Sequence, residues 1–100
     1  MKVDREQVLA KLREQREHIE REYGLRMIGI VGSVARGEAT EESDVDVFVE
    51  VIRAPSLFRM FDAERKLKEA VGIGLPVEFV FPDTLRPAMR ARMERDLLTI

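Results

Sequence analysis

Two apolar runs joined by a short polar segment constrain the fold of this chain more than any other feature of its sequence. The first run ends directly before Gly32-Ser33, and the second is entered through Asp44-x-Asp46. A glycine–serine pair is typical of a tight turn, and alternate residues of a strand point to one face of its sheet. The pattern therefore predicts a strand, a turn and a second strand that projects both aspartates from the same face.

The paired aspartates indicate a cation site. Two carboxylates held close together repel each other, and each resists ionisation unless a cation lies between them. Oxygen-only ligands suit Mg²⁺ or Mn²⁺, which also take up substrate phosphates, and backbone N–H groups of the Gly32-Ser33 turn would face those phosphates. The alternative is that Gly32, Ser43 and Asp44 only form a turn and a loop end. Gly, Ser and two Asp at this fixed spacing favour metal-assisted phosphoryl or nucleotidyl transfer.

Apolar periodicity predicts helices and strands in alternation along the rest of the chain. The helices are expected over residues 4–22, 56–71 and 86–97, a short helical turn over residues 33–37, and the strands over residues 26–31, 45–51 and 77–81. Asp4 and Ser56 are placed to cap their helices, and Gly24 to end the first one. Residues 98–100 fit either a short strand or a frayed end. The expected fold class is α/β (α+β), a small mixed β-sheet of three strands, or four if the end pairs, packed by helices in a single domain of residues 1–100.

The apolar residues of each helix predict which of its faces is buried. They are Val8, Leu9, Leu12, Ile19 and Tyr23 in the first long helix, Leu57, Phe58, Phe61, Leu67 and Val71 in the second, and Met89, Met93 and Leu97 in the last. On strand 45–51 the valines face away from Asp46. On strand 77–81, Glu78 alternates with Val77 and Phe79 and is therefore expected to be the acid nearest Asp46 in space.

Three short motifs carry a resemblance to a known family. They are Gly32-Ser33, Ala35-Arg36-Gly37 and Ser43-Asp44-x-Asp46-x-x-Val49. The set resembles the signature of the minimal nucleotidyltransferases, small members of the DNA polymerase beta-like nucleotidyltransferase superfamily that often occur as the antitoxin partner of HEPN-domain proteins. The likeness extends over nearly the whole chain in length and order of elements, and it is most specific within residues 32–49. It implies the nucleotidyltransferase (polymerase beta palm-like) fold.

The resemblance also implies a catalytic and metal-binding role for three acids. The family's third catalytic carboxylate lies on a later strand and is most often Asp. Here the candidate is Glu78, whose side chain is one methylene longer. Asp44, Asp46 and Glu78 would bind two Mg²⁺ (or Mn²⁺) ions, and Glu78 would also deprotonate the acceptor hydroxyl.

The activity implied by the resemblance is transfer of AMP from ATP to a tyrosine hydroxyl of a HEPN-domain toxin, which silences that toxin. Gly32 and Ser33 would hold the triphosphate, and Arg36 is a candidate for neutralising it. The alternative is an antitoxin that keeps the fold and blocks the HEPN protein by surface contact alone. The intact pair Asp44 and Asp46 favours the enzyme, whereas Glu78, with its longer side chain in place of the family's usual Asp, is compatible with the binding-only antitoxin.

Charge and composition narrow the class of partner. The chain carries 17 Lys and Arg against 19 Asp and Glu, a net charge of −2, which gives no general reason to bind nucleic acid. Residues 38–50 contain six acids and no Lys or Arg, so a divalent cation must mediate nucleotide binding there. Arg86, Arg90, Arg92 and Arg95 are expected to form a solvated helix face, with a partner surface or a triphosphate contact as the alternative. The absence of cysteine and of any membrane-spanning run is compatible with a cytoplasmic protein without a membrane partner.

Overall fold

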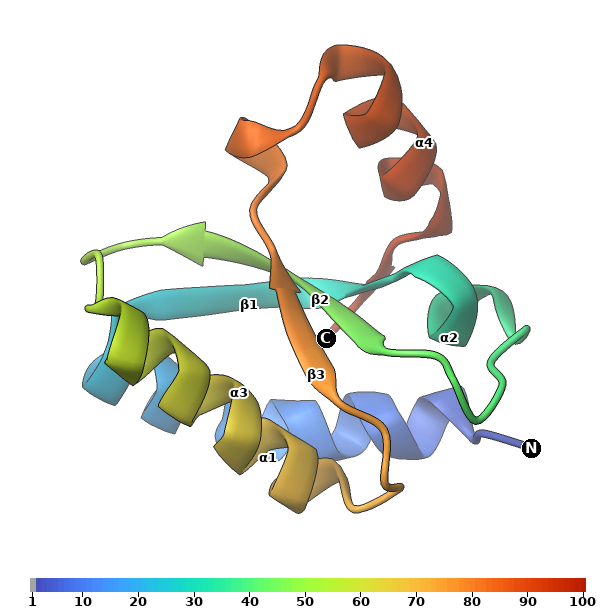
Figure 1. The fold of residues 1–100 in the computed structure, drawn as a ribbon, viewed down its shortest axis with the longest axis horizontal. Helices are drawn as coiled ribbons and strands as arrows, with labels where there is room; N and C mark the ends of the chain where they lie inside the picture. The colour runs from blue at the N-terminus through green and yellow to red at the C-terminus, as the bar shows by residue number, and fades with distance from the viewer. Residues whose placement is uncertain (1) are drawn as a thin grey trace.

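The computed structural model describes residues 2–100 and contains a four-stranded mixed sheet in the order β3-β2-β1-β4 (Figure 1). β1 (Leu25–Val31) pairs antiparallel with β2 (Val45–Val51), and β2 pairs in parallel with β3 (Val77–Val80). β4 (Leu98–Thr99) pairs antiparallel with β1, so the C-terminal residues form a short strand and not a frayed end. The predicted fold class, a small mixed sheet packed by helices, is confirmed.

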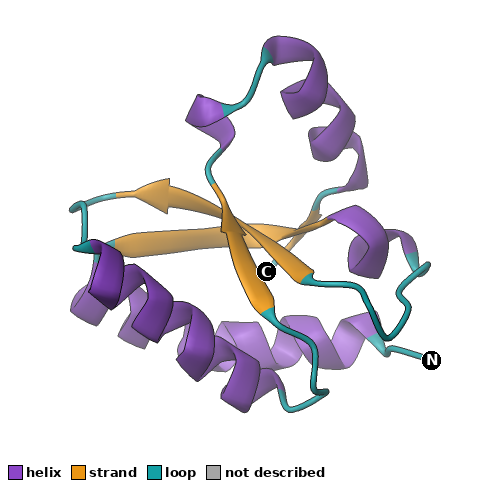
Figure 2. Cartoon of the chain, viewed as in Figure 1, coloured by secondary structure: helices purple, strands orange, loops and turns teal. Residues whose placement is uncertain are grey.

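Helices lie on both sides of this sheet (Figures 1 and 2). α1 (Arg5–Tyr23) and α3 (Leu57–Val71) pack side by side on one face, and α2 (Gly32–Arg36) follows β1 directly. A short 3-10 helix, η1 (Pro82–Thr84), and α4 (Pro87–Asp96) lie on the other side. The predicted helix and strand bounds differ from the observed ones by at most one residue at each end. Among residues 2–100, no helix is both long enough and apolar enough to cross a membrane.

The predicted caps occupy the ends of the long helices. Asp4 accepts hydrogen bonds from backbone N–H groups in the first turn of α1, and Ser56 accepts one from the N–H of Arg59 in α3. Gly24 ends α1 in the left-handed conformation, with a φ of 69°. Polar side chains that satisfy free N–H groups, and a glycine that tolerates positive φ, explain why these boundaries could be predicted.

The main core lies between the sheet and the layer formed by α1 and α3. The buried residues of α1 are the predicted ones: Val8, Leu9, Leu12, Ile19 and Tyr23. Val45, Val47 and Val49 of β2 project into the same core. Phe48 is buried on the opposite face, which alternation assigns to Asp46 as well. Asp46 therefore lies on the face of the sheet that α1 and α3 do not cover.

The predicted buried stripe of α3 is wrong in its first half. Three of its residues are largely exposed: Leu57 (60%), Phe58 (89%) and Phe61 (57%). The buried residues of this helix are Ala63, Leu67 and Val71. At 3.6 residues per turn, Phe58 and Phe61 lie about 180° and about 120° around the helix from Leu67, so they cannot face the same core. Leu57 lies about 80° around the helix from Leu67, nearer the buried side, and is exposed nonetheless.

The predicted inward face of α4 is also wrong. Met89 is 43% exposed, Met93 and Leu97 are only partly buried, and α4 has no buried residue. The helix does not pack its length against the sheet. At its last turn, Asp96 forms an ion pair with Arg36 of α2 at 2.9 Å. The three arginines of α4, Arg90, Arg92 and Arg95, are all exposed, as is Arg86 directly before it, in agreement with the predicted solvated face.

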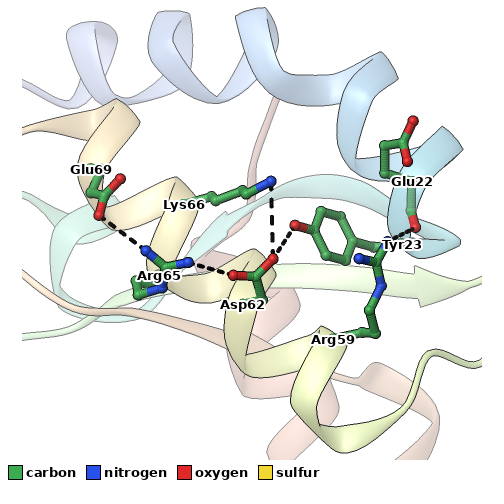
Figure 3. A network of polar contacts seen from close by, with 7 residues as sticks. All are labelled: Glu22, Tyr23, Arg59, Asp62, Arg65, Lys66 and Glu69. Atoms are coloured by element: carbon green, nitrogen blue, oxygen red, sulfur yellow. Dashed lines mark hydrogen bonds and ion pairs between the residues drawn. The ribbon is translucent and has the colours of Figure 1, made fainter.

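A polar cluster fastens α3 to the end of α1 (Figure 3). The Tyr23 hydroxyl donates to Asp62 Oδ2 at 2.6 Å, and Asp62 Oδ1 accepts from Arg65. The guanidinium carbon of Arg59 lies 4.5 Å from the centre of the Tyr23 ring, and the same side chain donates to the Glu22 carbonyl oxygen at 2.7 Å. The hydrogen bond from Tyr23, followed by that from Arg65, lowers the pKa of Asp62. The cluster therefore fixes the relative position of the two helices that support the sheet.

Candidate active site

Three carboxylates from two neighbouring strands converge on the face of the sheet that α1 and α3 leave uncovered. Asp44 lies directly before β2, Asp46 lies within it, and Glu78 lies on β3. The parallel register pairs Asp46 with Glu78, which places their side chains on the same face. One carboxylate oxygen from each of the three residues lies within 4.8 Å of the other two. The structure thus brings together the three acids that the sequence singled out.

Burial and the neighbouring carboxyls raise the pKa values of Asp46 and Glu78. Partial burial, followed by the charges of Glu78 and Asp44, raises the pKa of Asp46 to about 6, against a smaller opposing effect of Arg36. The pKa of Glu78 is raised first by burial, then by the adjoining Asp44 carboxyl, and further by the charge of Glu64. Full ionisation of the cluster at neutral pH is therefore unfavourable, and a bound cation would relieve it.

Gly32 allows the turn after β1 to lie directly against Asp46. Its φ of 76° is in the left-handed region, and a Cβ at this position would lie 2.5 Å from Asp46 Oδ2. A side chain is therefore excluded twice, by the backbone conformation and by the contact with the carboxylate. Ser33 follows as the second residue of α2. The glycine–serine turn and the carboxylates form one continuous site.

Ser43 closes the loop that leads into the site. Its hydroxyl oxygen accepts a hydrogen bond from the backbone N–H of Thr40 at 2.9 Å, and Thr40 Oγ1 accepts one from the N–H of Glu42 at 3.2 Å. Such side-chain-to-backbone bonds are typical of polar turns. The loop-end interpretation therefore describes Ser43, but not Asp44, whose carboxylate joins the cluster.

Arg36 is close to the cluster but is held by two acids. Its Nη1 donates to Asp96 Oδ2 at 2.9 Å, and its Nε donates to Glu38 Oε2 at 3.2 Å. The side chain lies near enough to Asp46 to lower the pKa of that residue. A triphosphate would compete with Asp96 and Glu38 for this guanidinium. Sequence reasoning missed Asp96, which lies 60 residues away in the chain and among arginines.

Glu64 is a second residue near the site that sequence reasoning missed. Its Oε2 accepts a hydrogen bond from the backbone N–H of Phe79 at 2.7 Å, next to Glu78 in β3. β3 is an edge strand, so this N–H has no strand partner on its outer side within residues 2–100. One sequence signal could have found Glu64: it lies three residues before the buried Leu67, on the inward side of α3, where an acid needs a partner.

The donor set fits a hard divalent cation. The three side chains supply only carboxylate oxygens, the ligands that Mg²⁺ and Mn²⁺ prefer. Arg36, the cation that acts on the pKa of Asp46, is itself paired with Asp96 and Glu38. Asp44, Asp46 and Glu78 could therefore hold such an ion where phosphates of a nucleotide would meet the turn at Gly32.

A carboxylate cluster on a small mixed sheet, beside a glycine–serine turn, is the arrangement expected of a nucleotidyl-transferring enzyme. The family model of the nucleotidyltransferase domain matches residues 12–98 of this chain, and the chain belongs to that family. The match includes the Gly32-Ser33 turn and all three carboxylates. The enzyme class predicted from the sequence is confirmed.

Similarities to individual proteins specify the relationship more closely than the family match does. The chain is similar to the protein adenylyltransferase MntA of Thermococcus cleftensis, with 33% identity over 95% of this chain and 94% of the relative. It is 32% identical to a Methanocaldococcus jannaschii protein provisionally named a protein adenylyltransferase, over 89% of this chain and 90% of the relative. A solved structure provisionally described as a minimal nucleotidyltransferase aligns with a TM-score of 0.67 and 29% identity, over 92% of this chain and 95% of the other. The family and fold implied by the motif resemblance are therefore confirmed.

Proposed function

We propose that this chain transfers AMP from ATP to a tyrosine hydroxyl of a HEPN-domain toxin and thereby acts as its antitoxin. The observation that carries this proposal is the convergence of Asp44, Asp46 and Glu78 beside Gly32, because nucleotidyl transfer needs these groups in register. The name of the Thermococcus cleftensis relative supports a protein as the acceptor. The resemblance of residues 32–49 to the minimal nucleotidyltransferases supports a HEPN toxin as that protein.

The site divides into a metal-binding part and a phosphate-binding part. The three carboxylates would hold two Mg²⁺ (or Mn²⁺) ions, which when bound neutralise the charge on the phosphate oxygens. Backbone N–H groups at Gly32 and Ser33, with the Ser33 hydroxyl, would hold the triphosphate against the carboxylates. Arg36 would add a positive charge to this part after exchanging its bond to Asp96 for one to phosphate.

Glu78 is the proposed base for the acceptor. The tyrosine hydroxyl gives its proton to Glu78, and the tyrosine oxygen forms a bond to the α-phosphorus of ATP. The bond from the α-phosphorus to the oxygen that bridges to the β-phosphate breaks, and its electron pair leaves with pyrophosphate. The products are pyrophosphate and a tyrosine that carries AMP.

Transfer is tested by incubating the chain with ATP, Mg²⁺ and a HEPN-domain protein from the same genome, followed by mass spectrometry of both proteins. We expect an added AMP on a tyrosine of the HEPN protein with the wild type and none with Asp44→Asn. Glu41→Gln is the matched control, because Glu41 is an exposed acid of the preceding loop and lies outside the cluster. An unmodified HEPN protein with all three variants would contradict the proposed transfer.

A binding-only antitoxin is the second candidate. It is favoured by Arg36, whose bonds to Asp96 and Glu38 occupy a side chain that the enzyme would need free. In that case a HEPN protein would be neutralised equally by the wild type and by Asp44→Asn while staying unmodified. Neutralisation that depends on Asp44 would instead support the enzyme.

A further inference from the structure

The last residues of β2 leave an unpaired strand edge. β3 pairs only with Val45–Phe48, so residues 49–51 have β1 on one side and, within residues 2–100, no strand on the other. The N–H of Val45 donates to the Pro76 carbonyl oxygen at 2.8 Å, on the β3 side. Backbone groups point to the same side at every second residue of a strand, so the N–H and C=O of Val51 also point to this open side. An extended polypeptide could pair there.

A groove of about 460 Å³ includes this edge and extends over the face of the sheet to Ile28 of β1. Its walls come from residues 49–51 of β2, from Pro55 and Met60 beside it, and from residues 81–84 and Arg90. Two acids and one arginine line the groove: Glu50 lies 3.6 Å from Arg26, and Arg90 is paired with Asp83 at 3.2 Å and with Glu94 at 2.8 Å. The arginine that a phosphate would need is therefore already paired, whereas the carboxylates can still accept hydrogen bonds from a polypeptide.

An apolar rim adjoins the groove, on the segment that joins β2 to α3 and on the first turns of α3. Six large apolar side chains are strongly exposed in residues 2–100, and five of them form this rim: Val51, Ile52, Leu57, Phe58 and Phe61. A concentration of exposed apolar side chains typically marks a protein contact. Five exposed apolar side chains beside an unpaired strand edge indicate a polypeptide partner.

The groove lies on the side from which the acceptor must approach. In an in-line displacement, the acceptor oxygen and the leaving pyrophosphate lie on opposite sides of the α-phosphorus. The Gly32-Ser33 turn, proposed to hold the departing phosphates, follows β1 on one side of β2, whereas Glu78 lies on β3 on the other. The groove begins at Val49, three residues after Asp46, which is about 10 Å along the strand. A segment bound in the groove is therefore within a few residues of the proposed base.

We infer that the groove and the apolar rim dock an extended segment of the acceptor protein, which pairs with the free edge at residues 49–51 and presents its hydroxyl side chain to Glu78. The inference rests on the proposed transfer activity and adds where, and in what conformation, the acceptor binds. A polypeptide fits because its main chain offers N–H and C=O groups at the spacing of a strand edge. The apolar rim, together with the Glu50 and Asp83 carboxylates in the groove, predicts a segment that carries apolar or basic residues next to the modified hydroxyl.

Val51→Pro tests the pairing, with Val51→Thr as the matched control. Proline removes the outward N–H without removing a hydrogen bond to β1, whereas threonine keeps both the N–H and the branched shape. For AMP transfer to the HEPN-domain protein, kcat/KM should fall about tenfold with Val51→Pro, as expected for one backbone hydrogen bond, and stay within about twofold with Val51→Thr. Calorimetric binding of ATP with Mg²⁺ should be the same in both variants. Equal transfer by the two variants would overturn the inference.

A second measurement is independent of the acceptor's identity. If the wild type does not modify the HEPN protein, the proposed function fails, and docking is examined with ¹⁵N-labelled Asp44→Asn protein. The probe is a synthetic peptide of alternating valine and threonine that contains lysines and one tyrosine. Docking should shift the amide signals of Val49 and Val51 and slow hydrogen exchange at Val51. No shift at this edge with millimolar peptide, or a dimer of this chain that Phe58→Ser abolishes in sedimentation, would overturn the inference.

Discussion

Replacing Asp46 with asparagine should stabilise the metal-free protein, although Asp46 belongs to the candidate site. Partial burial and the carboxyls of Glu78 and Asp44 raise the pKa of Asp46 from 3.8 to about 6 in the folded chain. The folded protein therefore binds this proton more tightly than the unfolded chain does. The resulting stabilisation is complete below pH 3.8 and is lost as the pH rises through about 6. Above that pH, the ionised Asp46 opposes folding.

The expected magnitude follows from the pKa. A rise from 3.8 to about 6 corresponds to about 3 kcal/mol at full effect. Asp46 is only half-buried, so solvent screening reduces the expected penalty to about 1–2 kcal/mol. Asparagine keeps the shape and removes the charge. Asp46→Asn should therefore raise the free energy of unfolding at pH 8 by this amount, which for a chain of 100 residues is about 5–10 °C in Tm.

Urea denaturation in EDTA at pH 4 and pH 8 measures the effect. Glu42→Gln is the matched control: Glu42 is an exposed acid just before the cluster, and its replacement should change stability by less than about 0.5 kcal/mol at either pH. Added Mg²⁺ at pH 8 should stabilise the wild type and have a smaller effect on Asp46→Asn. The electrostatic reasoning is refuted if Asp46→Asn is no more stable than the wild type at pH 8, or if the two differ equally at pH 4.

Three further predictions concern single residues. Glu78→Gln should lower AMP transfer by orders of magnitude and leave the circular dichroism spectrum unchanged. Glu78→Asp, which keeps the carboxylate, should retain part of the transfer activity. Full activity of Glu78→Gln would remove Glu78 from the mechanism. Gly32→Ala should destabilise the protein by about 1–3 kcal/mol in thermal unfolding. Gly37→Ala should destabilise the protein less than Gly32→Ala does. Gly37 also has a positive φ, but a Cβ added there would lie no closer than 3.8 Å to any atom beyond its chain neighbours. Tyr23→Phe should lower the free energy of unfolding by about 1 kcal/mol, because the hydrogen bond to Asp62 of α3 is lost, and should leave AMP transfer unchanged. A loss of transfer without a loss of stability would contradict this structural role.

The local parts of the site could be predicted from the sequence. The strand that carries Asp44 and Asp46 follows from alternation of apolar and polar residues, which is a property of neighbouring positions. The position of Glu78 followed from strand parity and from the family resemblance. The exposure of Phe58 and Phe61 could not be predicted, because hydrophobicity alone does not distinguish a residue that meets its own core from one left for a partner.

The polar pairs around the site join elements that are far apart in the sequence and close together only in the folded chain. Arg36 and Asp96 are 60 residues apart in the chain, and Glu64 and Phe79 are 15 apart. A bond between two such positions leaves no periodic pattern in the sequence. Motif reasoning could therefore select Arg36 as a candidate, but it could not show that α4 supplies the acid that holds it.

The hydrogen bond from the Phe79 N–H to Glu64 also bears on solubility. A strand edge with free outward donors can template the addition of another chain, which is the first step toward fibrils. Three of the four residues of β3 are apolar, and the carboxylate of Glu64 already accepts from the outward N–H of Phe79 while presenting a negative charge to any incoming carbonyl. Glu64 thus acts as a gatekeeper against edge-to-edge aggregation. A Glu64→Leu protein should fold and then, in concentrated solution, convert into thioflavin-binding aggregates that the wild type does not form.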